Sequence, residues 1–283
     1  MFKKAIKKNF SYTRPLLIGE RVFGNDNVMS GIGTFIVLNE EGYILTCKHI
    51  AEKIRTAELL DQKYENYLKE IQGKNDQEIK KINKKYDYID KIFQIKNIFM
   101  NCFEDGVLDT IIFHENLDLA LIKFSNFKKV LCDDFPTFSS KKLEVGESIC
   151  RLGFPWPSYN CFEVKNDKIE LMPNANFDTP AFPLDGMITR FIVENDEIVA
   201  FETSTPGLKG QSGGPVFDVH GNILGLQSAT GHLDLMFDIE FDLERNQKID
   251  HMYEKQFINL GLAISNNQII KFLDENKIKY NKK

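Results

Sequence analysis

Short apolar runs separated by turn residues occupy both ends of the sequence. Residues 34–38 and 43–45 are short apolar runs on either side of a turn at 39–42, as expected for two strands, and further strands are expected at 186–193, 197–203 and 257–264. Short strands spaced this closely favour antiparallel sheets and a mainly β fold. Residues 266–273 then have the spacing of an amphipathic helix that closes the chain.

The segment 52–99 has a helical period instead. Its larger hydrophobic side chains recur at spacings of three and four in two stripes, Leu60, Tyr64, Tyr67 and Ile71, and then Ile82, Tyr86, Ile89 and Phe93. Gly73 and Asn75 between the stripes supply a C-cap glycine and an N-cap residue. The pattern predicts a helical hairpin, a coiled-coil insertion in a β domain. Such an insertion is either a solvated decoration or an arm that docks a partner or covers a cleft.

Three separate motifs carry the candidate chemistry. Ser212 lies in the glycine-rich stretch Gly-Gln-Ser-Gly-Gly-Pro at 210–215, where backbone N–H groups can converge on one point. His49 follows the strand pair 34–45 in a Thr-Cys-Lys-His run, and Asp118 lies in the apolar run 116–122. A carboxylate in such a run needs a partner, and an imidazole would provide one. His114 is a second candidate base, but it lacks the hairpin context and is expected at the surface.

In this order, the motifs around His49, Asp118 and Ser212 resemble those of the chymotrypsin-like (trypsin-like) serine peptidases, in particular the bacterial Deg, or high-temperature-requirement, type. The stretches 151–155, 186–190 and 261–264 also resemble strands of that group. The resemblance implies two six-stranded antiparallel β-barrels and a C-terminal helix. The helical hairpin at about 52–99 would be an insertion, because the family has only a short connection between the histidine and aspartate strands. Residues 15–283 would form the peptidase domain after an N-terminal tail at 1–14, with no peptide-binding module following it.

The resemblance also implies the roles of individual residues. His49, Asp118 and Ser212 would form the catalytic triad of a serine endopeptidase that works through an acyl-enzyme, and the N–H groups of Gly210 and Ser212 would form the oxyanion hole. The expected substrate-binding residues are Thr205, Pro206, Gln227, Ser228, Ala229 and Thr230. None of these six residues is a carboxylate that could pair with a basic substrate side chain. We therefore expect a small or medium uncharged side chain at the cleaved position of the substrate.

Other classes of function share part of this pattern. A catalytically silent protease fold that serves as a binding or scaffold module usually has a damaged triad, whereas all three positions are intact here. An esterase would carry its serine on a strand-to-helix turn, but Pro215, Val216 and Phe217 after Ser212 favour a strand. A serine endopeptidase is therefore the leading hypothesis.

Composition limits the partners and the compartment. The 283 residues carry a net charge of −5, which gives no reason to expect nucleic acid, and no stretch is long and apolar enough to suggest a membrane partner. The basic segment 1–14 is expected to be a frayed, solvated end. Five cysteines without close paired spacing favour reduced thiols and a cytoplasmic protein, with no metal or other cofactor. The expected partners are a protein or peptide substrate and a regulatory protein that would bind the hairpin 52–99.

Overall fold

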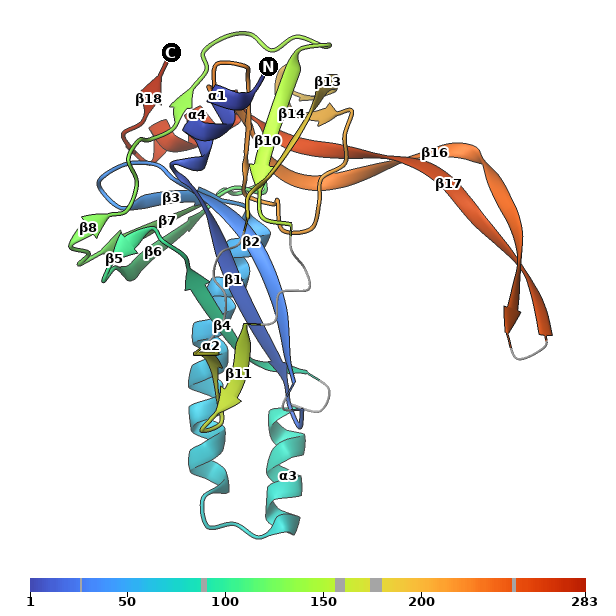
Figure 1. Ribbon diagram of the computed structural model, residues 1–283. Helices are drawn as coiled ribbons and strands as arrows, with labels where there is room; N and C mark the ends of the chain where they lie inside the picture. The colour runs from blue at the N-terminus through green and yellow to red at the C-terminus, as the bar shows by residue number, and fades with distance from the viewer. Residues whose placement is uncertain (26, 88–90, 156–160, 174–179, 246–247) are drawn as a thin grey trace.

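The computed structural model describes residues 1–283 except 26, 88–90, 156–160, 174–179 and 246–247. Strands make up 49% of the chain and helices 20%, so the fold is mainly β, as the sequence predicted. Two large sheets and a C-terminal helix agree with a trypsin-like double β-barrel (Figure 1).

The first sheet curls into a half-barrel. Its six strands run in the order β4-β1-β2-β3-β7-β6. Their bounds are β1 Thr13–Val22, β2 Val28–Val37, β3 Tyr43–Thr46, β4 Ile92–Phe99, β6 Val107–Phe113 and β7 Ala120–Ser125. Leu16, Phe35 and Leu121 are fully buried between these strands and α2, because alternate side chains of a strand point to the same face. A short pair, β5 (Phe103–Glu104) and β8 (Lys129–Val130), lies beside this sheet.

The second sheet closes on itself. Its order is β15-β10-β13-β14-β17-β16-β9-β18, and β15 also pairs with β16, so six of its strands form a ring. The bounds are β9 Thr137–Phe138, β10 Ser148–Gly153, β13 Phe182–Glu194, β14 Glu197–Thr203, β15 Pro215–Phe217, β16 Ile223–Arg245, β17 Lys248–Ser265 and β18 Asn281–Lys282. A separate hairpin pairs β11 (Phe162–Lys165) with β12 (Lys168–Leu171). The predicted C-terminal helix is present as α4 (Asn266–Glu275).

The predicted helical hairpin is present with different limits. Helix α2 (Lys48–Ile71) already starts before residue 52, and α3 (Asp76–Tyr86) begins after a capping box in which Asn75 accepts hydrogen bonds from Gln77 N and Glu78 N. Residues 92–99 are not helical: they form β4, which pairs with β1. Phe93 thus comes from a strand to pack against the hairpin, whereas Ile89 of the predicted stripe lies outside the described residues.

Two further expectations about the chain were wrong. The segment 1–14 is not a solvated tail, because it contains helix α1 (Lys3–Phe10) and the start of β1, and Phe2, Ala5 and Asn9 are buried against the second sheet. The polar, mixed composition of residues 231–256 predicts a surface loop or flap. The described residues 231–245 and 248–256 instead extend β16 and β17 into a long two-stranded ribbon that projects from the second sheet (Figure 1).

Among the residues that the structure describes, no helix combines the length and apolar character that a membrane span requires.

Candidate active site

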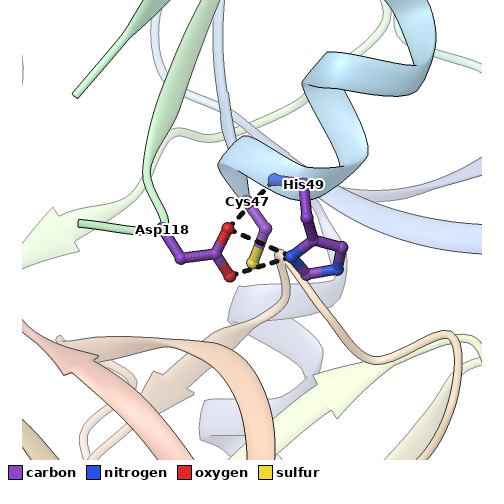
Figure 2. A group of neighbouring side chains, drawn as sticks. All are labelled: Cys47, His49 and Asp118. Carbon is purple, nitrogen blue, oxygen red and sulfur yellow. Dashed lines mark hydrogen bonds and ion pairs between the residues drawn. The ribbon is translucent and has the colours of Figure 1, made fainter. Parts of the chain in front are cut away.

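His49 and Asp118 are brought together by the first sheet. β3 and β7 are neighbours, with Thr46 opposite Ala120, so the residues just after β3 and just before β7 meet at one end of the sheet. His49 lies in the first turn of α2, and its backbone N donates to Asp118 Oδ1 over 3.0 Å. Its ring Nδ1 lies 2.9 Å from Asp118 Oδ2 and 3.0 Å from Oδ1 (Figure 2). Asp118 thus fixes both the backbone and the ring of His49.

Ser228, which sequence reasoning assigned to substrate binding alone, connects Asp118 with Ser212. Its hydroxyl donates to Asp118 Oδ2 over 2.5 Å, and its carbonyl oxygen accepts from Ser212 Oγ over 3.1 Å. Burial raises the pKa of Asp118, but the hydrogen bonds from His49 and Ser228 outweigh burial and hold that pKa below its ordinary value. Asp118 is therefore an anion at neutral pH.

The glycines around Ser212 have conformations that a side chain would prevent. Gly210 has φ +100°, and a Cβ there would lie 2.5 Å from Phe154 O. In the described part of the chain, neither the N–H of Gly210 nor that of Ser212 has an acceptor. These two donors are therefore free to bind a developing oxyanion.

Within the described residues, the ring of His49 makes no hydrogen bond to the nucleophile candidate Ser212, whose hydroxyl donates to Ser228 O. Catalytic hydrogen bonds are often long or misaligned before substrate binds, so the separation is compatible with a base and nucleophile pair. The side chain of His49 is 46% exposed and accessible to a substrate.

Cys47 is a neighbour of this group that the sequence did not single out. Its thiol, a ring nitrogen of His49 and a carboxylate oxygen of Asp118 lie within 4.8 Å of one another (Figure 2). Burial raises the pKa of Cys47 well above its ordinary value, which favours the thiol over the thiolate that binds metals, and Sγ donates to Gln227 O. Asp118 is already engaged by His49 and Ser228. The donor set thus fits a hydrogen-bonded histidine and aspartate pair better than a metal centre.

His114, the second candidate base, has a different place. Its Nδ1 accepts the backbone N–H groups of Asn116 and Leu117, and its ring packs against Phe272. Desolvation lowers the pKa of His114, so the neutral imidazole is favoured. This histidine stabilises the turn that leads to Asp118.

Comparison with known families agrees with this geometry. A family model described as a trypsin-like peptidase domain matches residues 33–226. The chain belongs to the trypsin-like peptidase domain family. The match covers more than half of the chain and includes His49, Asp118 and Ser212, and it supports a hydrolase that acts on peptide bonds. No curated protein matches the chain.

The predicted substrate-binding residues of this trypsin-like peptidase domain lie on two segments, 205–209 and 227–230, that meet near Ser212. Thr230 Oγ1 donates to Gly207 O over 2.8 Å, which holds the segment 205–209 against the segment 227–230. Gln227 is buried, and its Nε2 donates to Ala229 O. Thr205 and Pro206 are half-buried, whereas Ala229 is exposed. Arg151, which sequence reasoning missed, donates to both Thr205 and Gln227.

Gly213 provides a stability test of the nucleophile loop. It has φ +87°, and a Cβ there would lie 2.0 Å from Thr34 O. We expect Gly213→Ala to lower the free energy of unfolding by roughly 3 kcal/mol or more, because a strained backbone and a clash with backbone coincide. Gly231→Ala is the matched control, since nothing lies within 4 Å of that position. Urea unfolding measures both variants, and equal midpoints would contradict the description of the loop.

Proposed function

We propose that this protein is a serine endopeptidase that cleaves peptide bonds through His49, Asp118 and Ser212. The observation that carries the proposal is the continuous set of hydrogen bonds from His49 through Asp118 and Ser228 to Ser212. The half-buried anion orients an exposed imidazole and is linked through Ser228 to Ser212. Among the described residues the N–H groups of Gly210 and Ser212 lack acceptors, so the arrangement suits acyl transfer to that serine. The arrangement and the family membership support each other.

In the proposed reaction, Ser212 Oγ forms a bond to the scissile carbonyl carbon while its proton passes to His49 Nε2. The carbonyl oxygen becomes an oxyanion and accepts hydrogen bonds from the N–H groups of Gly210 and Ser212, where one donor lowers the barrier by about 3 kcal/mol. His49 then gives its proton to the leaving amine as the carbon–nitrogen bond breaks, and an ester to Ser212 is left. Water, deprotonated by His49, hydrolyses that ester.

Asp118 has two tasks in this sequence. Because it faces Nδ1, it keeps the proton of the neutral ring on that nitrogen and leaves Nε2 free to accept one from Ser212. Its negative charge also stabilises the imidazolium that forms during the attack.

The acyl-enzyme can be tested directly. Brief reaction with p-nitrophenyl acetate, followed by acid quench and peptide mass mapping, should place one acetyl group on Ser212. The same preparation should cut a denatured protein substrate and release new N-termini. Acetylation of other residues without peptide cleavage would contradict the proposal and would favour the alternative, a catalytically silent scaffold.

We also propose that the peptidase works in the bacterial cytoplasm, has the character of the Deg type and is regulated by a protein partner that binds the helical hairpin. Cys47, Cys102, Cys132, Cys150 and Cys161 are all free, which suits a reducing compartment. The far end of the hairpin projects beyond the first sheet (Figure 1), while Tyr64 and Tyr67 of α2 pack against Phe93 of β4. The exposed apolar side chains of the hairpin include Leu59 and Leu68.

A deletion separates regulation from chemistry. Ile50, Ala51, Ile54 and Ala57 of α2 belong to the main core, and β4 is part of the first sheet, so both must be kept. Replacing residues 62–90 by a short flexible linker should change kcat/KM for a short peptide by about twofold or less, since the triad is built elsewhere. Circular dichroism checks folding, and a folded variant without peptide hydrolysis would refute the independence of the hairpin.

A further inference from the structure

The side chain of Arg151 on β10 is completely buried in the second barrel. Its Nη1 donates to Gln227 Oε1 over 2.8 Å. Its Nη2 donates to Thr203 Oγ1, Thr205 O and Thr205 Oγ1 at 2.5, 2.5 and 2.7 Å. All these acceptors are neutral, and no carboxylate of the described residues forms an ion pair with the guanidinium. Its Nε is buried and has no acceptor among the residues that the structure describes.

An unpaired buried cation is unfavourable for folding. Removing a charge from water carries a large desolvation penalty, and neutral hydrogen bonds offset only part of it. Burial lowers the pKa of Arg151 to about 10, so the guanidinium is still charged at neutral pH. The second barrel therefore maintains a positive charge that lacks a negative partner among the described residues.

The position of this charge relates it to the triad. Gln227, which accepts from Arg151, also accepts the N–H of Gly213 at its carbonyl oxygen over 2.8 Å and precedes Ser228 in the chain. Thr205 lies at the start of the segment that leads to Ser212. The guanidinium thus lies beneath the two segments, 205–209 and 227–230, that converge on the nucleophile.

Two glycines, Gly261 and Gly207, leave space for the side chains of Arg151 and Gln227. A Cβ on Gly261 would lie 2.2 Å from Arg151 Nη1, so only glycine accommodates the guanidinium. Gly207 lies above it, and a Cβ there would lie 2.4 Å from Gln227 Nε2. The segments are joined at Gly207 by the hydrogen bond from Thr230, and the segment around Gly207 is half-buried and outside regular structure. A substrate side chain would reach the guanidinium only by parting the two segments, which breaks the hydrogen bond between Thr230 and Gly207.

We propose that Arg151 determines substrate specificity: the carboxylate of a glutamate or aspartate, at the residue whose carbonyl is attacked, enters between the two segments and pairs with the guanidinium. The inference rests on the proposed peptidase function and names its substrate class. It replaces the sequence-based expectation of an uncharged side chain, because that expectation considered only the residues of the two segments and not the strand beneath them. A hydrogen bond between a guanidinium and a carboxylate is charge-assisted and therefore stronger than the neutral hydrogen bonds that Arg151 makes here, and Nε is the nitrogen left to donate it.

The test compares peptides that differ at this one residue, which is Glu, Gln, Asp, Leu or Lys. At pH 7 we expect kcat/KM for the Glu peptide to exceed that for the isosteric Gln peptide by about tenfold or more, since hydrogen bonds between charged groups are the stronger ones. Fluorophosphonate labelling of Ser212 in the same preparation reports on the triad alone. A labelled enzyme that prefers Leu, Gln or Lys overturns the specificity proposal only, whereas an unlabelled enzyme that cuts no peptide overturns both proposals.

A variant pair assigns the preference to Arg151. Arg151→Gln should bring the Glu to Gln ratio close to one while fluorophosphonate labelling persists. Arg190→Gln, which removes an exposed arginine paired with Glu202 on the same sheet, should leave the ratio unchanged. A ratio that persists in folded Arg151→Gln overturns the assignment. If that variant does not fold, the ratio measured on the parent enzyme still decides whether an acidic side chain is preferred.

Discussion

Replacing Ser212 by alanine will lower kcat for peptide hydrolysis by about 10⁶-fold, the scale of loss when a triad nucleophile is removed. The residual rate should come from the oxyanion hole and substrate binding, which still act without the nucleophile. Folding should change little, because Ser212 Oγ makes one hydrogen bond, to Ser228 O, and such a bond contributes about 1 kcal/mol. Steady-state kinetics and thermal melting measure the two effects separately.

The exposed residue Ser140, whose hydroxyl donates to the carbonyl of Lys283, is the control for this prediction. Ser140→Ala should retain the parent rate. A Ser212→Ala variant that is folded and hydrolyses peptides at a comparable rate would contradict the assignment of the nucleophile.

The second large effect is expected from Asp118→Asn, which should lower kcat by about 10⁴-fold at neutral pH. An amide can donate to Nδ1 of His49, which moves the ring proton to Nε2 and leaves no base for Ser212. The substitution also removes the negative charge that stabilises the imidazolium. Single-turnover hydrolysis of a peptide measures the loss, and Asp109→Asn on the exposed side of β6 is the control.

The pH dependence of stability should identify the same carboxylate. The pKa of Asp118 in the folded protein is lower than its ordinary value, so its ionised form stabilises the fold at neutral pH. That contribution is present above the ordinary aspartate pKa and is lost as pH falls through the lower, folded value. Asp118→Asn should therefore reduce the acid sensitivity of unfolding below about pH 4. An unchanged acid limb would contradict the described role of the carboxylate.

The sequence predicted the parts of the protein in which local pattern and chemistry agree. Ser212 and His49 could be named as candidate catalytic residues because their sequence neighbours indicate the local backbone. Glycines lie close to Ser212 on both sides, and a strand pair precedes His49. The short strands predicted a mainly β fold, and the resemblance predicted its two barrels. Ser228 was assigned only a contact with substrate, because its bond to Asp118 joins residues 110 positions apart.

The errors have physical causes as well. Phe93 continued the helical spacing of residues 82–89. A short apolar run fits the period of a helix or of a strand, however, and residues 92–99 form a strand because β4 pairs with β1. In the ribbon, Leu233, Ile239 and Phe241 alternate with acidic residues, a strand pattern that the high polarity of the segment obscured. Arg151 could not be predicted, because its partners come from β14, β16 and the segment after β14.

Labelling with a fluorophosphonate probe tests whether His49 activates Ser212. The parent protein should be labelled at Ser212 and the Ser212→Ala variant should not, whereas His49→Ala should be labelled far more slowly because the serine has lost its base. Equal labelling of the parent and the folded His49→Ala variant, or no labelling of the folded parent, would contradict a serine activated by His49.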